Sequence, residues 1–228
     1  SVGTLRLTST SALPSGTDIT IKAGGTLDAA WSTSGSALIG NLSLGGVGVT
    51  GGTLAGSGAA LGDRGHFKLS GNLSVAGTST STISADLRIG DNATKTFNIS
   101  STGDASGNDL LISGKLGHYN GNTWGYVNQT GLGTLRITGT LELGGFTVSS
   151  GKLALNDASG IGMLGWVGGP VALNNNASLE INVSGSNSAS LLYAIEGTGT
   201  LTKVGTGTAL LAASNTYTGA TTVSAGTL

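Results

Sequence analysis

The sequence contains no cysteine, only two prolines and few charged or aromatic residues. The absence of cysteine excludes disulfide bonds, thiol catalysis and cysteine-based metal sites. Charged residues make up 9% of the 228 residues and the formal net charge is −1. Lys and Arg are not clustered as phosphate binding requires, so we expect no nucleic-acid partner. No apolar run approaches the roughly 18 residues of a membrane-spanning helix.

The N-terminus shows no charged segment followed by an apolar one, as a signal peptide would, and Ser1 is not an initiator Met. We therefore expect the chain to be a processed or excised piece whose targeting signals lie elsewhere. A membrane is expected as a partner only through an anchor outside this chain.

Glycine is abundant instead, with 42 residues. A glycine-rich chain with few charges could be a disordered linker, but apolar residues make up 38% of the sequence and recur regularly. The glycines have no three-residue period and proline is scarce, which excludes a collagen triple helix. The composition therefore indicates a folded chain with many turns.

One tripeptide, Gly-Thr-Leu, recurs along the whole chain. It begins at Gly3, Gly25, Gly52, Gly133, Gly139, Gly199 and Gly226. Variants with Asn or Lys in the middle begin at Gly40, Gly71, Gly114 and Gly151. Most neighbouring occurrences lie roughly 12 to 27 residues apart, at the short end of solenoid repeats.

Short runs around these tripeptides alternate between apolar and polar residues, which is the period of a strand with one buried face. The runs are 5–7, 19–21, 42–44, 135–137, 141–143, 153–155 and 179–181. Turn-forming Gly, Asn, Ser and Asp separate them. No stretch of about ten residues has a helical period, so the sequence predicts an all-β fold.

Two architectures fit short strands with frequent turns, a β-sandwich and a parallel β-helix. The reuse of one phrase favours the β-helix, in which each turn of the coil, or rung, meets a nearly identical neighbour. With about 20 residues per rung, we expect about ten rungs and a rod about 50 Å long, since rungs are about 4.8 Å apart.

A longer similarity links residues 131–153 with residues 205–228. Glycines at 131, 133, 144 and 151 correspond to glycines at 205, 207, 219 and 226, with one residue deleted in the earlier copy. The repeat unit is therefore interpreted as a block of several rungs.

The C-terminal residues carry a family resemblance. Gly205-x-Gly207-Thr208, then Asn215-Thr216-Tyr217-Thr218-Gly219, then Thr221-Thr222-Val223-x-Ala225-Gly226-Thr227-Leu228 resembles the passenger-associated transport repeat of bacterial autotransporters. Ala209 departs from it, because a larger apolar residue is usual there. The first 30 or so residues resemble what normally follows such a repeat.

This resemblance implies a right-handed, single-stranded parallel β-helix that is secreted through the outer membrane and displayed on the cell surface. The family's repeat is structural and has no catalytic residues to transfer. We therefore expect a non-enzymatic stalk or fibre segment without cofactors, with an adhesive role or end-to-end self-association as further expectations. Expected partners are neighbouring rungs, copies of the chain, glycans or surface receptors.

The first and last five residues, SVGTL and SAGTL, are nearly identical. Superposing Ser1 on Ser224 gives a shift of 223 residues. We therefore expect residues 1–228 to be a single β-helix segment and one unit of a longer array with a period near that shift.

The stretch 117–126 concentrates aromatic residues and one of the two histidines. Its candidate binding residues are His118, Tyr119, Trp124 and Tyr126, because aromatic faces and Asn side chains are typical of sugar-binding or protein-binding patches. The simpler interpretation is that these rings cover the core. Trp31 and Trp166 are isolated and are expected to be packing residues.

A β-helix can also be a polysaccharide-degrading enzyme, which requires carboxylates close in space. Asp104 and Asp109 are close in sequence, but a Gly/Ser-rich turn surrounds them, so turn hydrogen bonding is the favoured role. Gly107-Asn108-Asp109-Leu110 resembles part of a calcium-binding nonapeptide. Such a site requires the motif to recur in successive turns, and here it occurs once. A Ser-His-acid catalytic triad is not indicated, because no G-x-S-x-G motif accompanies His66 or His118. We therefore expect no catalytic and no metal site.

Overall fold

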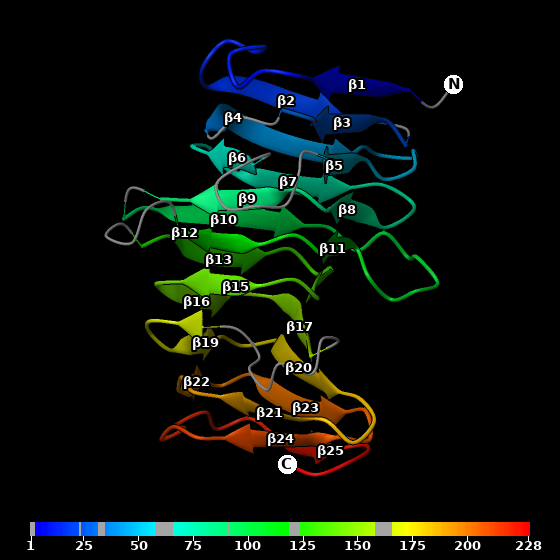
Figure 1. The fold of residues 1–228 in the computed structure, drawn as a ribbon. Helices are drawn as coiled ribbons and strands as arrows, with labels where there is room; N and C mark the ends of the chain where they lie inside the picture. The colour runs from blue at the N-terminus through cyan, green and yellow to red at the C-terminus, as the bar shows by residue number, and fades with distance from the viewer. Residues whose placement is uncertain are drawn as a thin grey trace.

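The fold was analysed in a computed structural model, which describes residues 3–22, 24–31, 35–57, 66–90, 92–118, 124–157 and 166–228. The described part consists of parallel strands stacked along one axis, with the N-terminal strand at one end and the C-terminal strand near the other (Figure 1). A complete rung contributes one strand to each of three faces in a fixed order, and the rungs at the two ends have fewer strands. The predicted all-β fold and parallel β-helix are confirmed.

The third face forms a sheet of its own that runs from β1 to β25. Its ten strands, all parallel, are β1 (Thr4–Leu7), β3 (Thr26–Ala29), β5 (Thr53–Gly56), β8 (Ser81–Ile83), β11 (Leu110–Ile112), β14 (Thr134–Ile137), β17 (Gly151–Asp157), β20 (Ala177–Val183), β23 (Thr200–Val204) and β25 (Thr221–Val223). Leu135 pairs with Leu153 and Thr53 pairs with Thr82, so rungs on this face are between 18 and 29 residues apart. The prediction of about ten rungs is confirmed.

The second face lies before the third in every rung. Its strands are β2 (Thr17–Ile21), the second half of β4 (Ser36–Gly45), β7 (Leu73–Ala76), β10 (Thr94–Ile99), β13 (Tyr126–Thr130), β16 (Gly145–Val148), β19 (Val171–Leu173) and β22 (Ile195–Gly197).

The first face precedes the second. It contains the first half of β4, β6 (His66–Leu69), β9 (Asp86–Ile89), β12 (Leu116–His118), β15 (Leu141–Leu143) and β18 (Trp166–Val167). β21 (Ser188–Leu191) and β24 (Thr208–Leu211) take the same place in the chain order and pair with each other. β4 turns the corner between two faces, because Ser36–Ile39 pairs with β6 and Leu42–Gly45 pairs with β7.

Aliphatic side chains fill the interior, where each stacks on its counterpart one rung away. One column on the third face contains Leu27, Leu54, Ile83, Ile112, Ile137, Leu155 and Ile181. Trp31 belongs to the same core, 1% exposed and edge-on to Phe67 at 5.7 Å between ring centroids. Its predicted packing role is confirmed, whereas the Trp166 side chain lies outside what the structure describes.

The recurring Gly-x-Leu phrase opens strands on all three faces. Gly-Thr-Leu precedes third-face strands at five of its seven positions and a first-face strand at Gly139, and at Gly226 it precedes an isolated bridge from Thr227 to first-face strand β24. At the corner of Gly139, glycine is required because the backbones of neighbouring rungs come too close together to leave room for a Cβ. A Cβ on Gly139 would lie 2.0 Å from the carbonyl oxygen of Gly114, the glycine of the same phrase one rung earlier.

The two similar blocks occupy different phases of the coil. Gly133 precedes third-face strand β14, whereas its counterpart Gly207 precedes first-face strand β24. Likewise Thr4 begins a third-face strand, whereas Thr227 pairs with Thr208 on the first face. The 223-residue array remains a prediction, and units joined at that shift would be rotated by one face.

Candidate functional site

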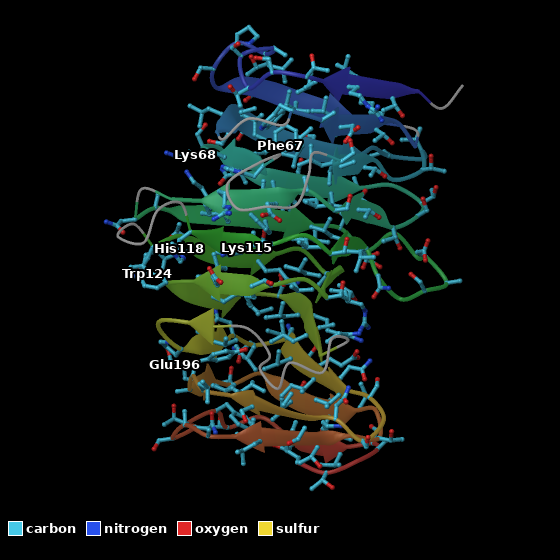
Figure 2. The ribbon with its side chains drawn as sticks, in the orientation of Figure 1. Phe67, Lys68, Lys115, His118, Trp124 and Glu196 are labelled. Atoms are coloured by element: carbon cyan, nitrogen blue, oxygen red, sulfur yellow. The ribbon has the colours of Figure 1, made fainter. Side chains whose placement is uncertain are left out.

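The predicted binding residues that the structure describes lie at the end of a first-face strand and at the start of a second-face strand. His118 ends β12, Tyr126 begins β13, and Trp124 lies just before β13. Tyr119 lies outside the described residues, as do residues 120–123. His118, Trp124 and Glu196 lie along one edge of the rod in the view of Figure 2.

His118 belongs to a network of charged side chains on the first face. Its Nδ1 lies 3.9 Å from Oε2 of Glu142, and the same oxygen lies 2.5 Å from Nζ of Lys115. Nη1 of Arg88 donates to the backbone carbonyl of His118 at 3.2 Å. The His118 ring is also 4.9 Å from the Trp124 ring, between centroids, and tilted by 51° to it. The His118 backbone therefore binds Arg88, and the His118 ring lies near Glu142 and Trp124.

Trp124 is held by the rungs on both sides. Its backbone N–H donates to Oδ1 of Asn92 at 3.1 Å, one rung earlier. On the other side, a Cβ added to Gly144 would lie 2.7 Å from the Cβ of Trp124. Trp124 thus packs at the corner against a glycine of the following rung.

Tyr126 has a different environment from His118 and Trp124. It is 38% exposed, and its ring extends over Gly144 and Gly145, where a Cβ would lie 3.0 Å from ring atoms Cζ and Cδ1 respectively. Tyr126 pairs with Gly145 in the parallel register of β13 and β16. The missing side chains of two consecutive glycines therefore make the space that the ring occupies.

A groove of about 430 Å³ runs along the second face from Thr94, past Tyr126 one rung later, to Glu196. Gly144, Gly145, Gly168 and Gly169 contribute backbone to it. Its polar side chains belong to Thr94, Thr147 and Glu196 on the outer side of β10, β16 and β22. Glu196 carries the one charge among the described residues that line the groove.

The groove brings together residues that the sequence analysis did not associate. Thr147 pairs with Ala172 and Ala172 with Glu196, so Glu196 lies three rungs from β13 although it is 70 positions beyond Tyr126 in the chain. The signal present in the sequence is a Gly-Gly pair at 144–145 that recurs one rung later at 168–169. Of His118, Trp124 and Tyr126, the predicted binding residues that the structure describes, only Tyr126 lines this groove.

The carboxylates considered for polysaccharide cleavage bind backbone amides. Asp104 accepts from the N–H groups of Ser106 at 2.8 Å and Thr80 at 3.1 Å. Hydrogen bonds from Ser106, and then from Thr80, lower the pKa of Asp104 to about 2. Asp109 accepts from the N–H groups of Thr102 at 2.5 Å and Thr134 at 2.6 Å. Both side chains thus have the turn-stabilising contacts that their sequence context predicts.

Asn108, within the calcium-like tetrapeptide, accepts from Nε of Arg136 at 2.5 Å through its side-chain oxygen. In the described part of the chain, no group of three or more His, Asp or Glu side chains converges as it would around a metal ion. A search of the same residues for long apolar helices finds none that could cross a membrane.

The C-terminal segment forms the last rungs. Leu201 is buried on β23, and Ala209 is buried on β24 where it pairs with Ala189. The small residue at 209, where the repeat usually has a larger one, therefore faces another small residue one rung earlier. Tyr217 packs against the edge of the core, and its hydroxyl lies 2.7 Å from that of Thr221.

Comparison with known families gives one match in this segment. Residues 201–228 match the model of the family described as Passenger-associated-transport-repeat. The resemblance stated from the C-terminal residues is therefore confirmed for these 28 positions. Neither the search of curated proteins nor that of solved structures gave a match.

Proposed function

We propose that the chain is a structural stalk segment of a bacterial autotransporter passenger, located at the cell surface or outside the cell. The main support is the unbroken parallel pairing of the third face from β1 to β25, which continues into the transport repeat at 201–228. Backbone hydrogen bonds between neighbouring rungs run along the axis, which makes a stiff rod without special chemistry.

This proposal is tested by display. The chain is fused, behind a signal peptide and an N-terminal epitope, to an autotransporter β-barrel without its own passenger. We expect antibody to label the epitope on intact bacteria, and electron microscopy of the released chain to show a rod of about 43 Å, nine intervals of about 4.8 Å. An epitope that stays inaccessible, or a released chain without rod shape, would contradict the proposal.

End-to-end stacking with further rungs or copies is part of the proposal. Among the described strands, β1 and β25 each have a partner on one side only, and open strand edges favour further pairing. Near β1, a hollow of about 580 Å³ is lined by Leu5, Leu13 and Ile19, and Leu5 is 59% exposed. Light scattering should show association that grows with concentration and weakens in Leu5→Lys. A Leu5→Lys variant that associates like the parent would contradict end-to-end stacking.

The non-enzymatic role is tested separately on a panel of polysaccharides. We expect no cleavage by the parent chain, because the candidate carboxylates Asp104 and Asp109 are engaged with backbone amides. A cleavage activity that is present in the parent and abolished by Asp104→Asn or Asp109→Asn would overturn it.

A further inference from the structure

The groove along the second face combines an exposed aromatic ring, glycine backbone and a few polar side chains, as ligand sites do. We propose that it binds an oligosaccharide that is neutral or amino-substituted and lies along the rod axis between Tyr126 and Glu196. This activity is additional to the stalk role and does not rest on it.

The first support is the aromatic platform. Tyr126 exposes 38% of its surface while its ring is held against the Gly144–Gly145 backbone. The apolar C–H face of a sugar ring packs on such an aromatic face, and the tyrosine hydroxyl remains available for a hydrogen bond. A ring that is already fixed loses little conformational entropy when a ligand binds.

The second support is the floor of the groove. Gly144, Gly145, Gly168 and Gly169 leave backbone where other positions of the face carry side chains, and a Cβ on Gly169 would lie 2.9 Å from the Gly144 carbonyl oxygen. A chain of sugar rings can therefore approach the peptide groups closely. The hydroxyls of Thr94 and Thr147 add the few polar groups that fix a ligand's orientation.

The third support is shape. Three rung intervals separate β13, which carries Tyr126, from β22, which carries Glu196. At about 4.8 Å per interval this is about 14 Å, a length that suits a short linear chain of rings. The volume of about 430 Å³ lies within the range of small-molecule sites.

The charge of the groove selects among glycans. Glu196 carries a carboxylate, and no Lys or Arg is present among the described lining residues. A uronic-acid polymer would bring its own carboxylates against Glu196 without a compensating cation. A neutral sugar avoids this repulsion, and the ammonium group of an amino sugar would pair with Glu196.

The test compares three trimers of equal length by calorimetry and by NMR titration. The probes are N-acetylglucosamine trimer, glucosamine trimer and galacturonic acid trimer. We expect the first two to bind at least about tenfold more tightly than the third, and Tyr126→Ala to weaken both by about tenfold or more. Glu196→Gln should remove the preference for the glucosamine trimer over its acetylated form.

Two further variants separate binding from folding. Tyr126→Phe should recover most of the affinity lost in Tyr126→Ala, since the ring is restored. Leu132→Ala removes a side chain that is 78% exposed and outside the groove, and it should bind all three trimers like the parent. Circular dichroism and melting temperature verify that each variant is folded.

Several results would overturn the proposal. One is the absence of binding by both favoured trimers at millimolar concentration. Others are affinity that persists in a folded Tyr126→Ala variant and tighter binding of the galacturonic acid trimer. Each of these leaves the display experiment unaffected, so failure of the glycan site is distinguishable from failure of the stalk.

Discussion

The central rungs and the C-terminal rungs use the same inward column of the third face differently. From Leu27 to Ile181 the column is aliphatic and buried. One rung later Lys203 pairs with Ile181, and then Val223, which is 49% exposed, pairs with Lys203. The segment that carries the family signature is therefore the one whose core is least like the rest.

Lys203 shows how the last rungs are closed. Its side chain is fully buried, and Nζ donates to the carbonyl oxygens of Val204 at 2.6 Å, Gly205 at 2.7 Å and Ala225 at 3.3 Å. Burial lowers the pKa of Lys203, so the carbonyl groups offset only part of the cost of desolvating the ammonium group. The central rungs are held by aliphatic packing, whereas the last rungs are held by an ammonium group that ties three carbonyls together.

The largest difference in stability between the two regions should appear when side chains of this column are shortened to Ala. Ile137→Ala removes a side chain that is 2% exposed from the middle of the stack. We expect it to lower the free energy of unfolding by about 2–5 kcal/mol, measured by urea titration. Val223→Ala, in the same column at the exposed end, should change it by less than about 0.5 kcal/mol. Similar losses for both variants would contradict the contrast.

Corner glycines should come next in effect. Gly139→Ala places a Cβ 2.0 Å from the Gly114 carbonyl oxygen and forces neighbouring rungs apart, which should cost about 1–3 kcal/mol. Gly3→Ala is the matched control, because it belongs to the same Gly-Thr-Leu phrase and its Cβ would have no atom within 4 Å. Equal melting temperatures for the two variants would show that the corners do not require glycine.

Lys203→Met tests the closure of the last rungs. Met fills a similar volume but leaves three carbonyl oxygens without their donor, so we expect a loss of about 1–2 kcal/mol in thermal unfolding. Ile181→Met, one rung earlier in the same column, keeps an apolar contact and should cost less. A Lys203→Met variant that is more stable than the parent would show that the ammonium group is not required.

The smallest expected effect lies on the surface loop between β10 and β11. The folded pKa of Asp104, about 2, is below its usual value of 3.8. Its contribution is therefore present above about pH 4 and is lost as the pH falls through about 2. The difference in melting temperature between the parent and Asp104→Asn should shrink over that range. A difference that stays constant would contradict the hydrogen-bonded role of the carboxylate.

Several features of the fold were predictable from sequence because they are local. The period-2 runs such as Leu135-Arg136-Ile137 became strands, since alternation needs only a buried and an exposed side. The face that each phrase occupies was not predictable. Gly133 and Gly139 open the same tripeptide on different faces, because at both corners a backbone carbonyl oxygen lies within 3 Å of where a Cβ would be.

The candidate site was predictable only in part. Tyr126 was identified from its aromatic neighbours, but the groove depends on Glu196 and Gly168, which lie three and two rungs away. Their proximity results from rung lengths that vary between 18 and 29 residues on the third face, and a single sequence does not reveal these lengths. Lys203 likewise occupies an inward position that its charge argued against.

The central claim, that the chain is one continuous parallel stack, is tested most directly by a spin-label distance. The chain has no cysteine, so Thr26→Cys and Thr222→Cys can be labelled without background. These positions belong to one outer column of the third face, which runs through Thr53, Thr82, Leu111, Arg136, Ala154, Glu180 and Thr202. Eight rung intervals predict a narrow distance distribution near 38 Å. A distribution centred well below about 30 Å, as two packed sheets would give, would contradict it.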